Sequence, residues 1–440
     1  MHLSTIISSF LAGATFVAAA PAKRATDPIP VEYVSMLNSY QSYVNTTLSK
    51  KDHRNGLRVC NHRNVQVRKE WRSMSKRERK KYVSAVQCMY RNRRSQANRK
   101  KVPGARNRLD DFLASHLVVS EKIHFNGHLF PWHRHFVWLY EQALREECGY
   151  KGAQPYWDWT LDAGNLLASP VFDGSDTSMG GNGEYFPHGH TELQAFGLDL
   201  QLPPGTGGGC LKSGPFSDLI VNMGLNQTIA PPASNVTAPI PKTLETADNK
   251  KVEPLSSPET SNITSPVDPT FETEKTFEPV GLIKFNEALN YNPRCLRRDL
   301  NLFWAEQLTA SHVLYLLQAS NADQLEKRID GWDGPDPTQP AMHPAGHFVV
   351  GGLQNDPFAS PGDPMFFLIH AQIDRLYTIW QSQDPARLYQ VGGTDKPLDL
   401  NNEGNPVKLN DRLNFGIVDG KRKLKNLLNT MDKYYCYAYE

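Results

Sequence analysis

Helical periodicity dominates the pattern of apolar and polar positions along this chain. Beyond Ser75, apolar residues recur at helical spacing, at Tyr82, Val83, Val86 and Met89. Ser75 and Glu78 have the spacing of a capping box, in which each side chain accepts a hydrogen bond from the other residue's backbone N–H. The pattern therefore predicts a helix that begins after Ser75 and runs toward Cys88.

Proline marks the start of two more predicted helices. Pro131 opens the segment "PWHRHFVWLYEQALREE", and proline is tolerated in a first helical turn but not in the middle of a helix. We therefore expect this helix to begin near Pro131, with His124 and His128 before it. In "SPGDPMFFLIHAQIDRLYTIWQ", Asp363 is predicted to cap a helix that has Pro364 in its first turn.

Two stretches interrupt the helical pattern. Residues 160–215 are rich in Gly, Asp and Ser and are expected to form long surface loops. Residues 228–275 are rich in Pro, Ser, Thr, Asn and Glu, which predicts an exposed, glycosylated excursion before helices return from Leu282. We predict a mainly α fold with long loops, in which residues 31–440 form a single domain.

Composition and charge narrow the class of protein. The 440 residues are 39% hydrophobic and 10% aromatic, which is enough to bury a large core. Lys and Arg (48) nearly balance Asp and Glu (46), so the net charge of +2 indicates neither a nucleic acid nor an anionic membrane as partner. The many basic residues that follow Ser75, through Arg108, are therefore predicted to form a solvated helix face and loop.

The N-terminal stretch "MHLSTIISSFLAGATFVAAAPAKR" is typical of a secretory signal peptide. Its apolar run, Leu11 to Ala20, ends in small residues and is too short to span a bilayer. We expect residues 1–19 to be a signal peptide and residues 20–30 a short pro-region or tail. The chain is therefore predicted to be secreted or to enter the secretory pathway.

Cysteines and glycosylation sequons agree with export. The chain has six cysteines: Cys60, Cys88, Cys148, Cys210, Cys295 and Cys436. Their even number favours disulfides over free thiols in an oxidising compartment. Spacing does not determine the pairing, although we favour a bond between Cys210 and Cys295. Asn-x-Ser/Thr sequons occur at Asn45, Asn226, Asn235 and Asn262.

Histidines are concentrated in the segment "HFNGHLFPWHRH", which contains His124, His128, His133 and His135. Successive helical residues are about 100° apart, so His133 and His135 point about 200° apart and only one of them can face a common site. Upstream, His116 lies in the apolar run "DDFLASHLVV". By itself, a lone histidine on such a face is more often a packed core residue than a metal ligand.

A second group of histidines follows in "MHPAGHFVVGG". His343 and His347 are four residues apart and can reach one metal from a single helix face if Pro344 places His343 at the helix start. A zinc protease needs a glutamate where Pro344 stands, so that chemistry is disfavoured. His370 lies on the later proline-marked helix, where Asp374, one turn on, either braces a ligand or neighbouring helix or forms an ordinary ion pair with an arginine.

Two groups of three histidines on helices with proline-marked starts indicate two metals in the core of a helix bundle. Ligation by imidazole alone suits copper well and zinc acceptably, but it suits magnesium and calcium poorly. Two facing copper ions would be suited to chemistry with dioxygen.

The segments "HFNGHLFPWHRHFVWLYE", "PYWDWT" and "HPAGHFVVGG", with "DPFASPGDPMFFLIHAQIDRLYTIW" after them, resemble the two copper signatures of the tyrosinase, catechol oxidase and hemocyanin superfamily. The resemblance is to the short secreted fungal form of these type 3 copper proteins and runs from about His116 to Trp380. It implies a four-helix-bundle core with a first metal held by His116, His124 and His133 and a second held by His343, His347 and His370. His128 and His135 match no ligand position.

The C-terminus also resembles that superfamily, in which a Tyr-x-Tyr motif closes the catalytic domain. The chain ends in "YYCYAYE", with Tyr435, Tyr437 and Tyr439. The resemblance therefore implies that no C-terminal shielding domain follows.

The resemblance implies an oxidase with two copper ions that uses O2 to convert o-diphenols, or a phenolic secondary metabolite, to o-quinones. The expected partners are O2 and a small phenolic or other aromatic substrate, and no catalytic residue beyond the metal ligands is assigned. Phe130, Phe348 and Phe367 are candidate pocket residues, although ordinary core packing accounts for each of them more readily.

Three positions depart from the superfamily pattern and keep other functions open. Lys122 replaces a cysteine that many fungal members cross-link to the second ligand, Pro344 replaces an asparagine thought to help deprotonate monophenols, and Ile369 replaces the first histidine of a His-His pair. The loss of asparagine disfavours hydroxylation of monophenols. The alternatives are a cyclopenase-like zinc enzyme for a redox-neutral rearrangement or elimination in secondary metabolism, and a dioxygen-binding protein without turnover.

Overall fold

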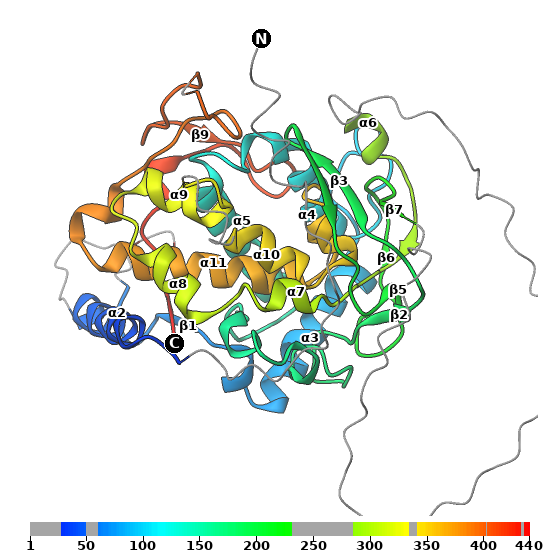
Figure 1. The fold of residues 1–440 in the computed structure, drawn as a ribbon, viewed down its shortest axis with the longest axis horizontal. Coiled ribbons are helices and arrows are strands. Elements are labelled where there is room, and N and C mark those ends of the chain that lie inside the picture. Colours follow the sequence, from blue (N-terminus) through cyan, green and yellow to red (C-terminus); the bar gives the residue numbers. More distant parts are fainter. Residues whose placement is uncertain (1–27, 50–59, 231–284, 334–340, 402, 433–434) are drawn as a thin grey trace, which may run out of the picture.

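Helices form the centre of the protein in this computed structural model, which describes residues 28–49, 60–230, 285–333, 341–401, 403–432 and 435–440 (Figure 1). The helices are α2 (Val31–Ser49), α3 (Lys76–Arg91), α4 (Arg108–Val119), α5 (Leu129–Glu146), α6 (Phe285–Ala288), α7 (Leu302–Ala305), α8 (Ala310–Leu317), α9 (Ala322–Asp330), α10 (Met342–Phe348) and α11 (Met365–Ser382). The strands are short: β1 (Gln66–Arg68), β2 (Gly183–Tyr185), β3 (Thr191–Ala195), β4 (Leu198–Leu202), β5 (Gly208–Leu211), β6 (Ile220–Val221), β7 (Thr228–Ile229), β8 (Arg294–Cys295), β9 (Arg412–Leu413), β10 (Arg422–Lys423) and β11 (Tyr437–Tyr439).

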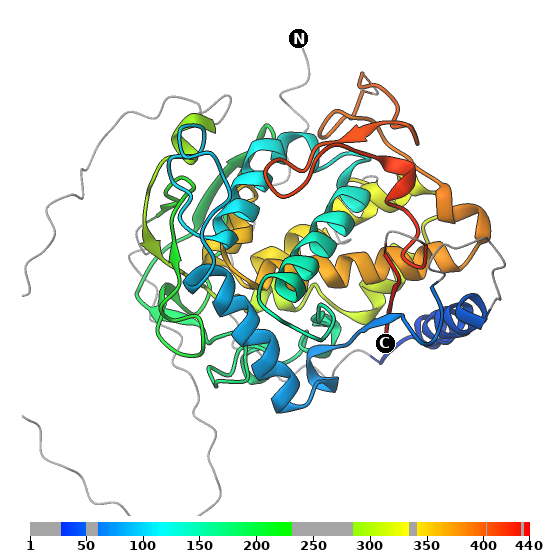
Figure 2. The ribbon, with the colours of Figure 1, turned by 180° about the vertical axis from the view of Figure 1, so that it is seen from behind.

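The helix α11 lies at the centre of the core, and its residues from Met365 to Gln381 are all buried. It packs against α2, α5, α8 and α10 (Figures 1 and 2). The neighbouring helix α4 contacts α5 through the ring of Phe112, whose centroid lies 5.5 Å from that of Phe136 and 5.4 Å from that of Tyr140. The prediction of a mainly α fold with a helix-bundle core is confirmed.

Local sequence signals place the helix starts correctly to within two residues. Ser75 and Glu78 form the predicted capping box at the start of α3. The helix α5 begins at Leu129, so Pro131 lies in its first turn, where a missing N–H removes no helical hydrogen bond. Before α11, Asp363 Oδ1 accepts a hydrogen bond from the N–H of Met365 at 2.9 Å.

The prediction of long surface loops over residues 160–215 is wrong where that segment forms strands. It contains the antiparallel pair β2–β5 and the hairpin β3–β4, to which β7 adds a third strand. At Gly183 a Cβ atom would collide with the carbonyl oxygen of Arg298, so glycine permits a close backbone approach. Part of the glycine content therefore reflects strand packing, and not loop formation alone.

Several expectations lie outside the described residues. These are the signal peptide (1–19), the pro-region except for residues 28–30, Leu282, and residues 231–275 of the excursion with Asn235 and Asn262. The asparagines of the other two sequons, Asn45 and Asn226, are described and exposed. Helices return with α6 at Phe285, but they are short until α8.

All six cysteines form disulfides, and the predicted Cys210–Cys295 bond is one of them. The others join Cys60 to Cys436 and Cys88 to Cys148. Disulfides of this kind are typical of an oxidising compartment. Within the described ranges, no helix has both the length and the apolar character needed to cross a membrane.

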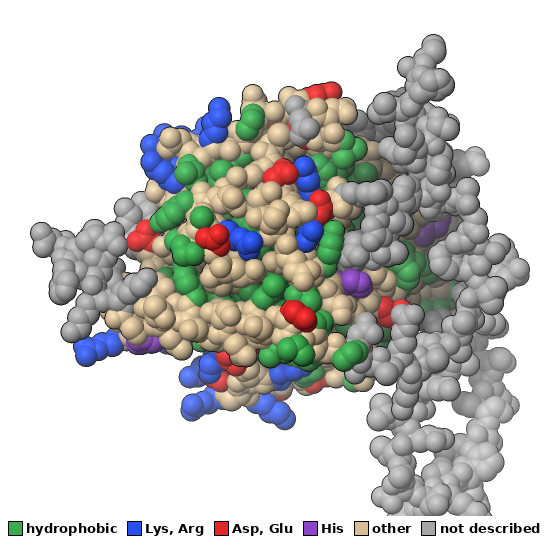
Figure 3. All heavy atoms as spheres, turned by 60° about the vertical axis from the view of Figure 1, so that its left-hand side comes forward, with side chains coloured by type: hydrophobic (Ala, Val, Ile, Leu, Met, Phe, Trp, Pro, Cys, Tyr) green, Lys and Arg blue, Asp and Glu red, His purple; other side chains and the backbone are tan. Residues whose placement is uncertain are grey.

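The basic residues of and beyond α3 lie mostly on the surface, as predicted. Some form ion pairs, among them Lys80 with Asp176 and Arg91 with Asp218. Others are exposed and have no ion pair with a described residue: Lys76, Arg77, Lys81, Arg93, Arg94, Arg99, Lys100 and Lys101. Figure 3 shows Lys and Arg side chains along the lower edge of the molecule, at the height of the start of α3 in Figure 1.

The C-terminal strand β11 is tied to the helical core through Asp374. It pairs in parallel with β1, and the hydroxyl groups of Tyr437 and Tyr439 each donate to Asp374 Oδ2 at 2.6 Å. Arg134 Nε donates to the other carboxylate oxygen at 2.5 Å, and Arg68 Nη1 lies 3.2 Å from Oδ2. Of the two expectations for Asp374, the structure confirms the ion pair with arginine, and it shows that this ion pair braces α5, which carries Arg134.

Candidate metal centre

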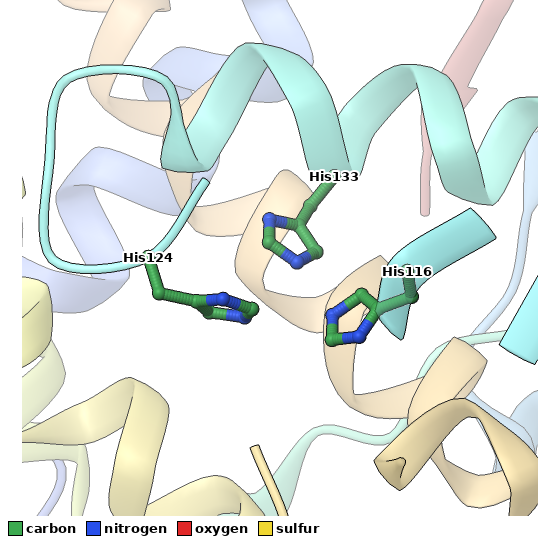
Figure 4. Close-up of side chains that lie close together, drawn as sticks. All are labelled: His116, His124 and His133. Carbon is green, nitrogen blue, oxygen red and sulfur yellow. The ribbon is translucent and has the colours of Figure 1, made fainter. Parts of the chain in front are cut away.

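The first histidine triad consists of His116, His124 and His133. His116 comes from α4, His133 from α5, and His124 from the loop between these helices. Their ring centroids lie 5.0 to 5.7 Å apart, and one nitrogen from each ring lies within 4.8 Å of the others. Figure 4 shows the three rings directed toward a common space.

The second triad consists of His343, His347 and His370. The first two lie one turn apart on α10, and the third is on α11. One nitrogen from each ring again lies within 4.8 Å of the others. Pro344 occupies the first turn of α10 after His343, as the sequence predicted.

The two triads lie against each other. The rings of His133 and His370 are stacked with centroids 4.2 Å apart, and those of His124 and His343 are parallel to within 3° at 5.8 Å. The six imidazoles therefore form one cluster of two adjacent triads, although its members are up to 254 residues apart in the chain, from His116 to His370.

Hydrogen bonds at Nδ1 orient five of the six imidazoles. Nδ1 of His116, His124 and His133 lies 2.8 to 2.9 Å from the carbonyl oxygens of Phe358, Ser120 and Leu129, respectively. In the second triad, Nδ1 of His343 lies 2.7 Å from Asp330 Oδ1, and Nδ1 of His347 lies 2.7 Å from Gln354 Oε1. The backbone carbonyl oxygens and Gln354 Oε1 can only accept, so the Nδ1 atoms that face them carry the proton and the corresponding Nε2 atoms keep a free lone pair.

The Nε2 atoms of the triads are better suited to binding a metal than to bonding the protein groups around them. Those of His116, His133 and His343 are buried without a hydrogen-bond partner among the described residues, and such unpaired buried atoms are costly. His347 Nε2 and His370 Nε2 face each other at 3.1 Å. Two metal ions ligated by these nitrogens would satisfy them.

Burial lowers the pKa of every imidazole in the site, and the neighbouring histidines lower most of them further. The pKa falls to about 3 for His124, His343 and His347, and well below its ordinary value for His116, His133 and His370. The rings are therefore neutral near pH 7, which is the form that binds metal.

Acid will destabilise the metal-free protein through these histidines. An unfolded histidine binds a proton below pH 6.5, whereas the folded ones resist protonation to about pH 3. The free energy of unfolding should therefore fall as the pH drops below 6.5, by about 1.4 kcal/mol per pH unit for each such group. Urea titrations of chelator-treated protein from pH 8 to 4 measure this slope. His124→Asn should make the slope shallower, and an unchanged slope would contradict its attribution to the triads.

The remaining histidines of the first cluster lie outside the triads. His135 points to the opposite side of α5, where its Nδ1 lies 2.9 Å from the hydroxyl oxygen of Tyr435 and its Nε2 lies 2.9 Å from Asp419 Oδ2. His128 is half-buried, and its Nδ1 donates to the carbonyl oxygen of Lys122 at 3.2 Å. The prediction that only one of His133 and His135 can face the site is confirmed.

Sequence reasoning missed the residues that orient the ligand candidates. Asp330 is the last residue of α9, 13 residues before His343. Gln354 and Phe358 lie in the stretch "LQNDPFASP", to which the spacing of residues assigned no role. Gln354 is buried and also donates to the carbonyl oxygen of Ser360 at 3.0 Å, which holds its amide in place. No periodicity signals such partners, because they lie outside the helices that carry the histidines: Asp330 ends α9, and Gln354 and Phe358 follow α10.

Of the three departures from the superfamily pattern, Pro344 lies in the first turn of α10, and the other two are Lys122 and Ile369. Lys122 is exposed, and no cysteine is free, so a cysteine cross-link to His124 is excluded. Ile369 is fully buried on α11. Of the three phenylalanines considered for the pocket, Phe367 stacks on Tyr140 at 3.4 Å between centroids and belongs to the core.

Fold and site together define a mainly helical protein with two adjacent triads of histidines. Residues 106–383 match the family model described as the common central domain of tyrosinase. Tyrosinase P of Aspergillus terreus is 36% identical over 378 residues, which cover 85% of this chain and 91% of that protein. N-acetyl-6-hydroxytryptophan oxidase of Emericella nidulans is 32% identical over 408 residues, which cover 87% of this chain and 94% of that one.

A solved structure is also similar. A variant of polyphenol oxidase from Thermothelomyces thermophila matches with a TM-score of 0.73 at 30% identity, covering 93% of this chain and 98% of the other. The chain therefore belongs to the tyrosinase family, a family of di-copper proteins, and it is an oxidoreductase.

Proposed function

We propose that the protein binds two copper ions, one in each histidine triad, and uses O2 to oxidise o-diphenols or a phenolic secondary metabolite to o-quinones. The observation that carries the proposal is the pair of adjacent triads in which buried imidazole nitrogens lack a protein partner. Imidazole ligands without carboxylate or thiolate suit copper better than the other common biological metals. The copper pair would supply the electron transfer between phenol and dioxygen.

The protein's own residues hold and shield the site. Asp330 and Gln354 fix the ring orientations of His343 and His347, so that both Nε2 atoms point inward. The ligand candidates are at most 7% exposed, which keeps bulk water away from the reacting groups. All six are neutral near pH 7, so metal binding need not displace protons.

The substrate class is argued from this chain's residues and from its relatives. Pro344, next to His343, offers no side-chain donor or acceptor that could assist proton removal from a monophenol. We therefore propose a preference for substrates that already carry two adjacent hydroxyl groups. The printed name of one relative, an N-acetyl-6-hydroxytryptophan oxidase, refers to an aromatic compound with one ring hydroxyl, so it supports the broader class of phenolic substrates and not the preference for two hydroxyl groups.

We also propose that residues 31–440 form one catalytic domain and that the protein is secreted after removal of residues 1–19. The described residues share one hydrophobic core that extends from Tyr33 on α2 to Tyr439 on β11. Three disulfides support an oxidising compartment.

Metal analysis combined with oxygen binding tests the proposal. The purified protein should contain two copper ions per chain, develop an absorption band when O2 is added to the reduced form, and convert catechol to o-benzoquinone. Stoichiometric zinc without a band would refute the oxidase and favour a redox-neutral reaction. Two copper ions with a band but no quinone from any o-diphenol would indicate an oxygen-binding protein.

A further inference from the structure

The tip of the β3–β4 hairpin carries an unusual residue. Ala195 pairs with Leu198, so Phe196 and Gly197 form a two-residue turn. Both have positive φ, 53° for Phe196 and 78° for Gly197. Such turns normally use Asn, Asp or Gly, and a bulky side chain with positive φ is strained. Strain of this kind is found at functional sites more often than elsewhere.

The ring of Phe196 lies against the first histidine triad. Its centroid is 5.6 Å from that of His124. It also lies 5.0 Å from Phe125 and stacks on Phe358 at 5.3 Å with 21° between the ring planes. Phe196 is half-buried, whereas His124 is 3% exposed, so the phenylalanine ring forms a boundary between the site and solvent.

The two residues whose rings contact Phe196 are hydrogen-bonded through their backbones to groups of the histidine site. Phe125 also has positive φ, 54°, and its N–H donates to Asp330 Oδ2 at 3.1 Å, while the other oxygen of that carboxylate holds His343. The carbonyl oxygen of Phe358 accepts from Nδ1 of His116. We call Phe125, Phe196 and Phe358 the aromatic rim. Because the carbonyl group of Phe358 contacts His116 and the N–H of Phe125 contacts the carboxyl group that orients His343, these two rim residues cannot move far without disturbing the site.

We infer that Phe196 is a specificity-determining residue, which limits the size of ring substituents that a phenolic substrate can bring to the His124 side of the site. The inference rests on the proposed function. A flat aromatic ring can stack on the rim, whereas a branched substituent would collide with Phe196. The chain should therefore favour monocyclic o-diphenols with small substituents. Among the three rim residues, Phe196 is carried by a hairpin tip that supplies no ligand candidate, so its side chain can be altered independently.

Two substitutions separate the ring from the backbone strain. Phe196→Ala and Phe196→Gly both remove the ring, but only glycine relieves the left-handed backbone, so the glycine variant should melt at the higher temperature. Both should raise the ratio of kcat/KM for 4-tert-butylcatechol to that for catechol by at least about tenfold. Copper content should stay unchanged. Phe186→Ala is the matched control, because Phe186 is 36% exposed and its ring contacts His188, outside both triads.

Binding of unreactive aromatic acids provides a measure that needs no turnover. We expect the dissociation constant of 4-tert-butylbenzoate, relative to that of benzoate, to fall in both Phe196 variants when binding is measured by calorimetry. Unchanged ratios in variants that keep their metal would overturn the inference. If even the unaltered protein oxidises no catechol, the proposed function fails, and the binding ratios still decide whether Phe196 limits access.

Discussion

Under the proposed function, replacing His133 by Gln will lower the rate of catechol oxidation by more than about 100-fold and will remove one of the two proposed copper ions. Loss of a residue that only orients a metal ligand already costs 10- to 100-fold in affinity or activity, and loss of a ligand costs more. His133 is 1% exposed, and its Nε2 has no partner among the described residues. Its ring also stacks on His370 of the other triad, so both binding positions will be affected.

His135→Gln is the matched control for this prediction. His135 lies on the same helix two residues further on, but it contacts Tyr435 and Asp419 and not the triads. It should therefore keep both metals and an activity within about twofold of the original, with some loss of stability because its buried contacts are weakened. Metal analysis by mass spectrometry and a catechol assay measure both effects. A loss of metal in His135→Gln together with full occupancy in His133→Gln would show that the assigned ligands are out of register.

Asp374→Asn will destabilise the protein by about 3–5 kcal/mol, the range found when one partner of a buried ion pair is removed. Asp374 is 3% exposed and lies between Arg68 and Arg134, which are both fully buried. Asparagine keeps the shape of the side chain but removes its negative charge, so the positive charges of the two buried guanidinium groups are less well balanced. Among the described residues, Glu141, at 2.6 Å from Arg68, is then the only buried carboxylate paired with either arginine.

The same substitution should also change the response to acid. Burial raises the pKa of Asp374, but the charges of Arg134 and Arg68 outweigh it and hold the pKa below its ordinary value. A carboxylate with a lowered folded-state pKa stabilises the protein above its unfolded pKa, and this contribution is lost as the pH falls through the folded value. The Asp374→Asn variant has no carboxylate at this position to protonate, so its free energy of unfolding should fall less in acid than that of the unaltered protein.

Urea unfolding at pH 7 measures the effect of Asp374→Asn, and Asp176→Asn is its control. Asp176 pairs with Lys80 at 2.6 Å, but the two side chains are 72% and 56% exposed, so the substitution should cost no more than about 1 kcal/mol. Equal costs for the two variants would contradict a structural role of the buried cluster.

Local signals in the sequence were sufficient for the helices that carry the site. The capping box of Ser75 and the position of Pro131 depend only on residues within one turn, because the first N–H groups of a helix are satisfied or absent locally. Helix geometry alone separated His133 from His135 and paired His343 with His347. Composition misled the prediction for residues 160–215. A glycine-rich segment looks the same in sequence whether its glycines allow close packing of strands or form loops.

Taken by itself, the sequence determined the helix starts, the spacing of the histidines within each segment and the resemblance that joins them into two ligand sets. Only the tertiary structure decided what surrounds those histidines. His116 depends on the carbonyl oxygen of Phe358, 242 residues away, and His343 depends on Asp330. Cys60 pairs with Cys436 across 376 residues. Such partners lie on different elements that only the packing of the chain brings together, and no local periodicity records a hydrogen bond made between separate elements.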